Sequence, residues 1–223
     1  MISKKQLEII LSKLKEIEKP KIELEQYSTP SYIVAEILNL AYLSNDIENK
    51  KVADLCCGSG KFGIGCFLLN AKSVTFVDID KEMIKLAKEN FNLVKENFPN
   101  TKCKVKFLCK DALKVREKFD TLFQNPPFGL QSEFSDLNFL EHAMKIAKKV
   151  YSLHGYSEKS RKFLKEFIEK RNGKIEKIIK LKFTIPKIFK FHKKQRYSYY
   201  VDCYVIEMLK VRKNFFEIKA LNK

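Results

Sequence analysis

The 223-residue chain has no tryptophan, only seven glycines and six prolines, and no long run of apolar residues. Its longest apolar run, around residues 62–71, is far shorter than the roughly 20 residues that cross a membrane. No basic stretch followed by an apolar stretch opens the chain, so we expect no signal peptide. The six cysteines form no C-x-x-C pair and no Cys/His ligand spacing. We therefore expect no metal site and no disulfide scaffold, which fits a reducing cytoplasm.

Acidic residues are scarce in the last third of the chain. Residues 151–223 hold 20 basic and 7 acidic residues, a net charge of +13, whereas residues 1–150 hold 24 and 20. A general bias toward lysine would not explain this asymmetry. The basic last third therefore indicates a polyanionic partner.

Patterns typical of strands and helices alternate along most of the chain. Helical spacing of apolar residues predicts helices over residues 3–19, 61–69, 81–97, 139–149 and 159–170, and one that begins at Pro30 with Thr29 as its cap. Strands are predicted over residues 51–55, 73–77, 105–108, 150–154, 174–183 and 197–208, and one that ends at Asn125. The alternation predicts a doubly wound α/β fold, and the last two strands, which lack an intervening helix, predict an antiparallel edge.

The stretch Asn125-Pro126-Pro127-Phe128 directly follows a predicted buried strand. Two prolines end that strand because proline cannot donate to the hydrogen-bond ladder. Asn125 is therefore expected at the carboxyl end of a strand, where open α/β sheets bind ligands. The prolines also stiffen the loop, remove two N–H donors and leave outward-facing carbonyl acceptors.

These residue types suit a reaction at the exocyclic amine of a planar base, a poor nucleophile because its lone pair is delocalised into the ring. The side-chain oxygen of Asn125 and the carbonyl of Pro126 can each accept one N–H. Two acceptors fixed out of the base plane would localise the lone pair, and Phe128 can stack on the ring. We predict that Asn125, Pro126, Pro127 and Phe128 promote attack of the amine on an electrophilic methyl group.

Three glycines, Gly58, Gly60 and Gly63, form a G-x-G-x-x-G pattern between a predicted strand and helix, and Asp78 lies twenty positions after the first. This is a nucleotide-binding pattern, and its plain interpretation is NAD. Acidic residues favour S-adenosylmethionine, because Asp54 would repel a pyrophosphate and suit a cation. Asp111 follows the third strand, where it could accept from an adenine amine.

A cysteine at position 56, beside these glycines, is unusual, and its side chain is expected to require a negative φ.

With these residues in place, the chain resembles class I S-adenosylmethionine-dependent methyltransferases. More narrowly, it resembles the methyltransferase-like protein 5 family, N6-adenosine methyltransferases of small-subunit ribosomal RNA, and its archaeal relatives. The resemblance covers about residues 24–207, and its family-specific parts are Gln26-Tyr27-x-Thr29, residues 150–154 and residues 190–194. It implies a Rossmann-like fold whose seven-stranded, mostly parallel sheet has an antiparallel last strand and helices on both faces.

The chain length suits one domain, so we expect a single methyltransferase domain over residues 1–223, with an N-terminal helical part (1–45), a cofactor-binding core (46–155) and a basic C-terminal part (156–223). The resemblance implies a cofactor site lined by Gln26, Thr29, Cys56, Ser59, Lys61, Asp78, Asp111 and Ala112. The glycine pattern and the strand ends beside it add Asp54, Gly58, Gly60 and Ile79 to the predicted cofactor site. Cys56 and Lys61 depart from the family, which usually has glycine and an apolar residue there. Family members in eukaryotes depend on a small zinc-binding activator protein that adds a strand to the sheet.

A basic run between the last two predicted strands is the expected RNA contact, through Lys190, His192, Lys193, Lys194 and Arg196. Two alternatives stay open. A protein glutamine-N5 methyltransferase uses a similar Asn-Pro-Pro loop, although its substrate would not need a basic tail. A non-catalytic RNA-binding protein would need neither the glycine loop around Gly58, Gly60 and Gly63 nor the stretch Asn125–Phe128, called the acceptor loop below. No catalytic role is assigned to His154, which is expected at a strand end.

Overall fold

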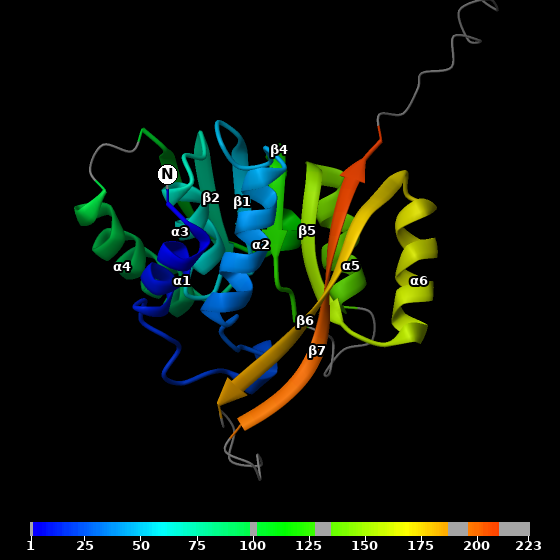
Figure 1. The fold of residues 1–223 in the computed structure, drawn as a ribbon, viewed down its shortest axis with the longest axis horizontal. Helices are drawn as coiled ribbons and strands as arrows, with labels where there is room; N and C mark the ends of the chain where they lie inside the picture. The colour runs from blue at the N-terminus through cyan, green and yellow to red at the C-terminus, as the bar shows by residue number, and fades with distance from the viewer. Residues whose placement is uncertain (1, 99–101, 128–134, 187–195, 210–223) are drawn as a thin grey trace, which may run out of the picture.

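The computed structural model describes residues 2–98, 102–127, 135–186 and 196–209. Seven strands form one sheet in the order β3-β2-β1-β4-β5-β7-β6 (Figure 1). The first five are mutually parallel, and β7 is antiparallel to both β5 and β6. The predicted fold class is confirmed, including the antiparallel pair at one edge. The strands are β1 (Lys51–Leu55), β2 (Ser73–Asp78), β3 (Lys104–Cys109), β4 (Phe119–Gln124), β5 (Ala147–Gly155), β6 (Gly173–Pro186) and β7 (Arg196–Met208).

Helices cover both faces of the sheet. Side chains of α1 to α4 pack with one face in a single apolar cluster, and those of α5 and α6 pack with the other face. The helices are α1 (Lys4–Ser12), α2 (Ser31–Leu43), α3 (Lys61–Leu68), α4 (Lys81–Asn97), α5 (Ser135–Ile146) and α6 (Glu158–Glu169), with short 3₁₀ turns η1 (Ile22–Leu24) and η2 (Ala112–Lys114). No helix in the described ranges is both long and apolar enough to cross a membrane.

Two of the element boundaries that differ from the sequence prediction do so for tertiary reasons. The first helix ends at Ser12, well before residue 19, because buried Asn90 accepts from the Lys15 N–H at 2.8 Å and donates to the Lys15 carbonyl at 3.0 Å. Strand β5 begins at Ala147, where residues 147–149 were predicted as helix, because it pairs with β4 from that residue onward.

The strand register brings the predicted site together. Leu55 lies opposite Val77 of β2 and opposite Gln124 of β4. The residues that follow these positions, Cys56, Asp78 and Asn125, therefore leave three neighbouring strands at the same carboxyl edge of the sheet.

The β6–β7 hairpin also reaches this edge, where it contacts the chain between α1 and the start of α2 (Figure 1). Residues 13–32 are called the N-terminal segment below. The hydroxyl of Tyr32, in α2, donates to the Lys182 carbonyl at 2.7 Å and accepts from the Thr184 N–H at 3.0 Å. The buried ring of Phe183 packs edge-on against Tyr27, with centroids 6.4 Å apart. The hairpin is thus fixed beside the carboxyl ends of the parallel strands.

Candidate active site

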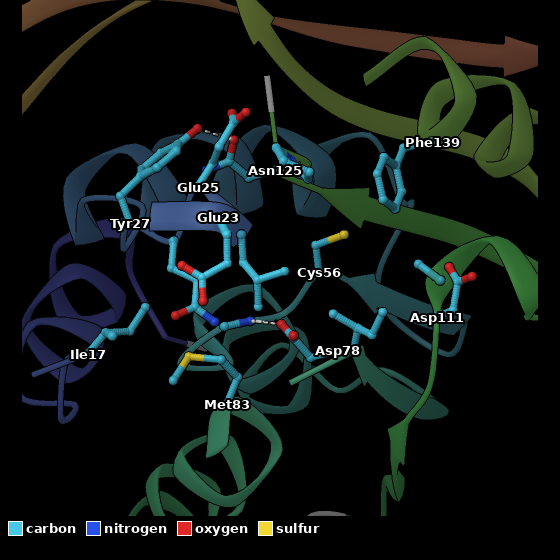
Figure 2. A pocket seen from close by; sticks show the side chains of 16 residues that line it. Ile17, Glu23, Glu25, Tyr27, Cys56, Asp78, Met83, Asp111, Asn125 and Phe139 are labelled. Atoms are coloured by element: carbon cyan, nitrogen blue, oxygen red, sulfur yellow. Dashed lines mark hydrogen bonds between the residues drawn. The ribbon is translucent and has the colours of Figure 1, made fainter. Parts of the chain in front are cut away.

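A cavity of about 280 Å³ lies at the carboxyl edge of β1, β2 and β4 (Figure 2). Its walls combine residues from the N-terminal segment, the strand ends and α5. Nine of the predicted site residues line it: Gln26, Cys56, Gly58, Asp78, Ile79, Asp111, Ala112, Asn125 and Pro127.

The remaining predicted residues lie elsewhere. A smaller neighbouring cavity of about 40 Å³ contains Thr29, Asp54, Ser59 and Lys61. Gly60 and Pro126 line neither of these two cavities. Phe128, Lys190, His192, Lys193 and Lys194 lie outside the described residues, and Arg196 is the first residue of β7.

The prediction from sequence missed seven residues that line the larger cavity. Glu25 and Tyr27 flank Gln26 in a stretch that the family resemblance already marked, so that stretch could have identified them. Phe139 reaches the cavity only through the tertiary position of α5, for which the sequence holds no local signal. The full set is Ile17, Glu23, Leu24, Glu25, Tyr27, Met83 and Phe139.

The lining of the larger cavity is acidic. It includes the carboxylates Glu23, Glu25, Asp78 and Asp111, and none of the sixteen lining residues is lysine or arginine (Figure 2). Carboxylates in a partly enclosed site attract a cation and repel a pyrophosphate. The cavity therefore suits a cationic ligand much better than a dinucleotide.

Asp78 is held by the backbone of the loop that it faces. Its Oδ2 accepts from the Gly58 N–H at 2.9 Å, and its Oδ1 accepts from the Asp80 N–H at 3.0 Å. Burial raises the pKa of Asp78, while these backbone hydrogen bonds oppose the rise. Each carboxylate oxygen keeps a further acceptor position, so the side chain can also receive hydroxyl donors from a ligand.

The glycine loop requires left-handed backbone at three positions. Cys56, Gly58 and Gly60 have φ values of 55°, 51° and 84°. The prediction of a negative φ for Cys56 was therefore wrong. The backbone of Cys56 takes a positive φ because it belongs to a tight turn, in which the Gly60 N–H donates to the Cys57 carbonyl at 2.8 Å. A cysteine side chain at positive φ has a steric cost.

This conformation gives a prediction for the stability of the protein. Cys56→Val should lower the free energy of unfolding by about 1–3 kcal/mol, because a β-branched residue is strongly disfavoured at positive φ. Cys56→Gly should change it by less than about 1 kcal/mol, since relief of strain offsets the greater freedom of glycine in the unfolded chain. Urea denaturation of both variants tests this. Equal stability of the two would show that position 56 is not strained.

Asp54 is buried below the loop, with its side chain 1% exposed. Its Oδ2 accepts from the Gly63 N–H, in the first turn of α3, at 2.8 Å. Burial raises the pKa of Asp54 well above its usual value, and the hydrogen bond from Gly63 partly offsets this. The contact fixes the loop on the start of α3, and the role of Asp54 toward a ligand stays a prediction.

Asn125 is oriented by two residues of the N-terminal segment. Its Nδ2 donates to Thr29 Oγ1 at 2.9 Å, and its Oδ1 accepts from the Tyr27 hydroxyl at 3.1 Å. Burial raises the pKa of Tyr27 well above its usual value, so the phenol stays protonated and donates. One acceptor position on Oδ1 therefore remains for a substrate N–H.

The same contact corrects the prediction that Thr29 caps the second helix. The N-cap of α2 is Pro30, without a side-chain hydrogen bond, and the Thr29 hydroxyl is used by Asn125 instead.

Polar contacts tie the N-terminal segment to the loops around the cavity. Asp80 Oδ2 accepts from Lys21 Nζ at 2.7 Å and from Gln26 Nε2 at 2.8 Å. Burial opposes ionisation of Asp80, but these hydrogen bonds outweigh it and lower its pKa. Buried Lys61 donates to the Thr29 carbonyl at 3.0 Å and pairs with Glu16. Gln26 and Lys61, both predicted cofactor residues, thus hold the wall of the site.

Comparison with known proteins places this architecture among methyltransferases. The family model described as "Conserved hypothetical protein 95" matches residues 34–179. An uncharacterized protein of Methanocaldococcus jannaschii is 37% identical, over 94% of this chain and 96% of that protein. The rRNA N6-adenosine-methyltransferase METTL5 of Danio rerio is 36% identical, over 89% of this chain and 95% of that protein. A solved Pyrococcus horikoshii structure, a candidate RNA methyltransferase, has a TM-score of 0.82 and 37% identity, covering 94% of this chain and 100% of that chain.

Proposed function

We propose that this chain, which belongs to the METTL5 family of rRNA N6-adenosine methyltransferases, methylates the N6 amine of an adenosine in RNA with S-adenosylmethionine as donor. The family predicted from the sequence is confirmed. The observation that carries the proposal is the acidic cavity at the carboxyl edge of the sheet, with Asn125 in its wall.

The lining residues fit S-adenosylmethionine. Asp78 offers free acceptor positions for ribose hydroxyls. Asp111 lines the same cavity and could accept a hydrogen bond from an adenine amine. Glu23 and Glu25 supply negative charge for the ligand's cationic end. When bound, S-adenosylmethionine supplies an electrophilic methyl group.

Asn125 and Pro126 are proposed to act on the substrate amine. The free acceptor position of Asn125 Oδ1 would accept a hydrogen bond from one N6–H and help to localise the lone pair of the nitrogen. The carbonyl of Pro126, which lines neither cavity, stays the proposed acceptor for the second N6–H. Tyr27 and Thr29 keep the Asn125 amide in a single orientation, so little reorganisation accompanies the reaction. Catalysis would then rely on orientation, and the proton that the methylated amine releases would pass to water, so no dedicated general base is needed.

A basic and aromatic cluster at the same edge supports an RNA substrate. Lys180 Nζ lies 3.5 Å from the ring centroid of Tyr156 and 4.5 Å from that of exposed Tyr200. Tyr156 directly follows β5, and its N–H donates to the Tyr200 carbonyl at 3.2 Å. At about 4.8 Å per strand, the cluster lies roughly 10–15 Å from Asn125 across the sheet. Exposed aromatic rings beside lysines can stack bases and neutralise phosphates.

Variants of this cluster give a second prediction. Lys180→Ala should reduce the slope of log K against log salt for RNA binding by roughly 0.7, as expected for one phosphate contact to a single strand. Tyr200→Ala should weaken binding by about 1–3 kcal/mol with little change in that slope, because stacking is not ionic. Fluorescence anisotropy at several salt concentrations measures both. The control is Lys72→Ala, which removes an exposed lysine at the amino edge of the sheet. If Lys180→Ala and Lys72→Ala have the same salt slope, the cluster does not belong to the RNA-binding surface.

Finer parts of the proposal rest on the family resemblance. We propose small-subunit ribosomal RNA as the substrate, and one methyltransferase domain that works in the cytoplasm, where the six free cysteines would stay reduced. We also propose a small zinc-binding activator that adds a strand to the sheet. Within the described sheet, β3 and β6 each pair with one neighbour only, so either edge offers backbone groups for such an addition.

Transfer of a radiolabelled methyl group tests the proposed function. We expect label from S-adenosylmethionine to enter small-subunit RNA and to be absent from protein fractions. Label in protein alone would support the glutamine-N5 alternative. Binding of RNA without any transfer would support the non-catalytic alternative.

A further inference from the structure

Buried polar side chains form a continuous series of hydrogen bonds beside the acceptor loop. Gln124 Nε2 donates to Ser152 Oγ at 2.9 Å. Ser152 Oγ lies 2.8 Å from His154 Nε2, and His154 Nδ1 lies 3.2 Å from Asp136 Oδ2. Gln124 and Ser152 are fully buried, and His154 is 1% exposed. The series therefore runs from the end of β4, across β5, to the first turn of α5.

The strand geometry explains how these side chains meet. Ser152 and His154 are two residues apart on β5, so they point to the same face of the sheet. Ser152 lies directly opposite Gln124 in the β4–β5 register. The ring of His154 also packs edge-on against Tyr204 of β7, with centroids 5.6 Å apart.

The donors and acceptors along the series are complementary. Because Gln124 donates to Ser152 Oγ, the serine hydroxyl hydrogen is free to donate to His154 Nε2. His154 Nδ1–H then donates to the carboxylate of Asp136. This tautomer is assigned from the network, and it gives every bond in the series one donor and one acceptor.

Stability alone does not account for polar residues at these positions. Gln124 Oε1 is buried without a partner among the described residues, which costs free energy that an apolar side chain would avoid. Neighbouring positions on the same face, such as Leu122 and Val150, are apolar and fully buried. Position 124 is thus polar where the sheet core would favour an apolar residue.

The two ends of the series lie in the elements that precede and follow the acceptor loop in the chain. Gln124 immediately precedes Asn125, and Asp136 is the second residue of α5, the helix that follows the acceptor loop in the chain. We propose that His154, together with Ser152, is a positioning residue that ties both sides of the loop to β5 and so fixes Asn125 toward the substrate amine. The catalytic part of this inference rests on the proposed function.

Steady-state kinetics of RNA methylation tests the positioning role. In His154→Leu and Ser152→Ala, we expect kcat to fall about 10- to 100-fold while KM for RNA and Kd for S-adenosylmethionine stay within about threefold. His154→Gln should recover most of the lost kcat, since its amide can accept from Ser152 and donate to Asp136. Ser152→Ala is the smaller change and keeps the test possible if His154→Leu does not fold.

The matched control is Tyr151→Phe, on the opposite face of the same strand. Tyr151 donates to Asp46 Oδ2 at 2.7 Å, so the variant loses one hydrogen bond of β5 without touching the series. Its kcat should stay within about twofold of the wild type. An equal loss of kcat in Tyr151→Phe and His154→Leu would overturn the positioning role.

Hydrogen–deuterium exchange followed by mass spectrometry gives a readout that does not depend on activity. Peptides that cover the end of β4 up to Pro127, and peptides that cover α5, should exchange faster in His154→Leu and Ser152→Ala than in Tyr151→Phe. Unchanged exchange in all three would contradict the inference even in an active enzyme. If the wild type does not methylate RNA, the proposed function fails, and the exchange measurement still decides whether the series restrains the loop.

Discussion

Asn125→Ala should lower the turnover of RNA methylation at least about 100-fold, because it removes an acceptor that acts on the amine during the reaction. The affinity for S-adenosylmethionine should change little, since Asp78 and the acidic residues of the cavity remain. Single-turnover kinetics and calorimetry measure the two quantities separately.

The control for Asn125→Ala is Asn92→Ala, the same chemical change on the exposed surface of α4. It should leave turnover and stability close to those of the wild type. A fully active Asn125→Ala enzyme would rule out the proposed role of the acceptor loop.

Asp78→Ala should weaken S-adenosylmethionine binding by about 2–3 kcal/mol, or roughly 30- to 150-fold, the scale of charge-assisted hydrogen bonds. The variant also loses the hydrogen bond that Asp78 accepts from the Gly58 N–H, so the loop is less well ordered before binding. Calorimetry measures the loss. Unchanged affinity would remove Asp78 from the cofactor site.

The pH dependence of binding gives an independent check on Asp78. Burial raises the pKa of this carboxyl, and the ionised form is the better acceptor, so affinity is full above the raised pKa and falls as the pH is lowered through it. Asp78→Ala should lose this dependence. Asp120→Ala is the control, because Asp120 also accepts a backbone N–H, from Lys51 at 3.0 Å. Asp120 lies at the amino end of β4, so this variant should keep the pH dependence of binding.

The sequence was sufficient where local signals and strand order coincide. Asn125 and Asp78 were placed correctly at one edge because each was expected where a predicted strand ends, and parallel strands align their carboxyl ends. The β6–β7 pair was predicted because two strand patterns follow one another without a helix between them.

The sequence was insufficient where the outcome depends on distant partners. The path of the N-terminal segment follows from contacts such as Asn90 with Lys15, 75 residues apart. The positive φ of Cys56 follows from the turn as a whole, and the residue type at that position predicts the opposite. His154 was expected at a strand end, but its bond to Asp136 exists only once β5 and α5 are packed together.

Mass spectrometry of nucleosides tests the central claim most directly. Small-subunit RNA would be incubated with S-adenosylmethionine and the wild-type chain, with and without a co-expressed activator, and in parallel with Asn125→Ala. We predict N6-methyladenosine in the wild-type reactions and at least about 100-fold less with the variant. Methylation at another atom of adenosine, or equal N6-methyladenosine with both proteins, would contradict the claim that Asn125 directs methyl transfer to the N6 amine.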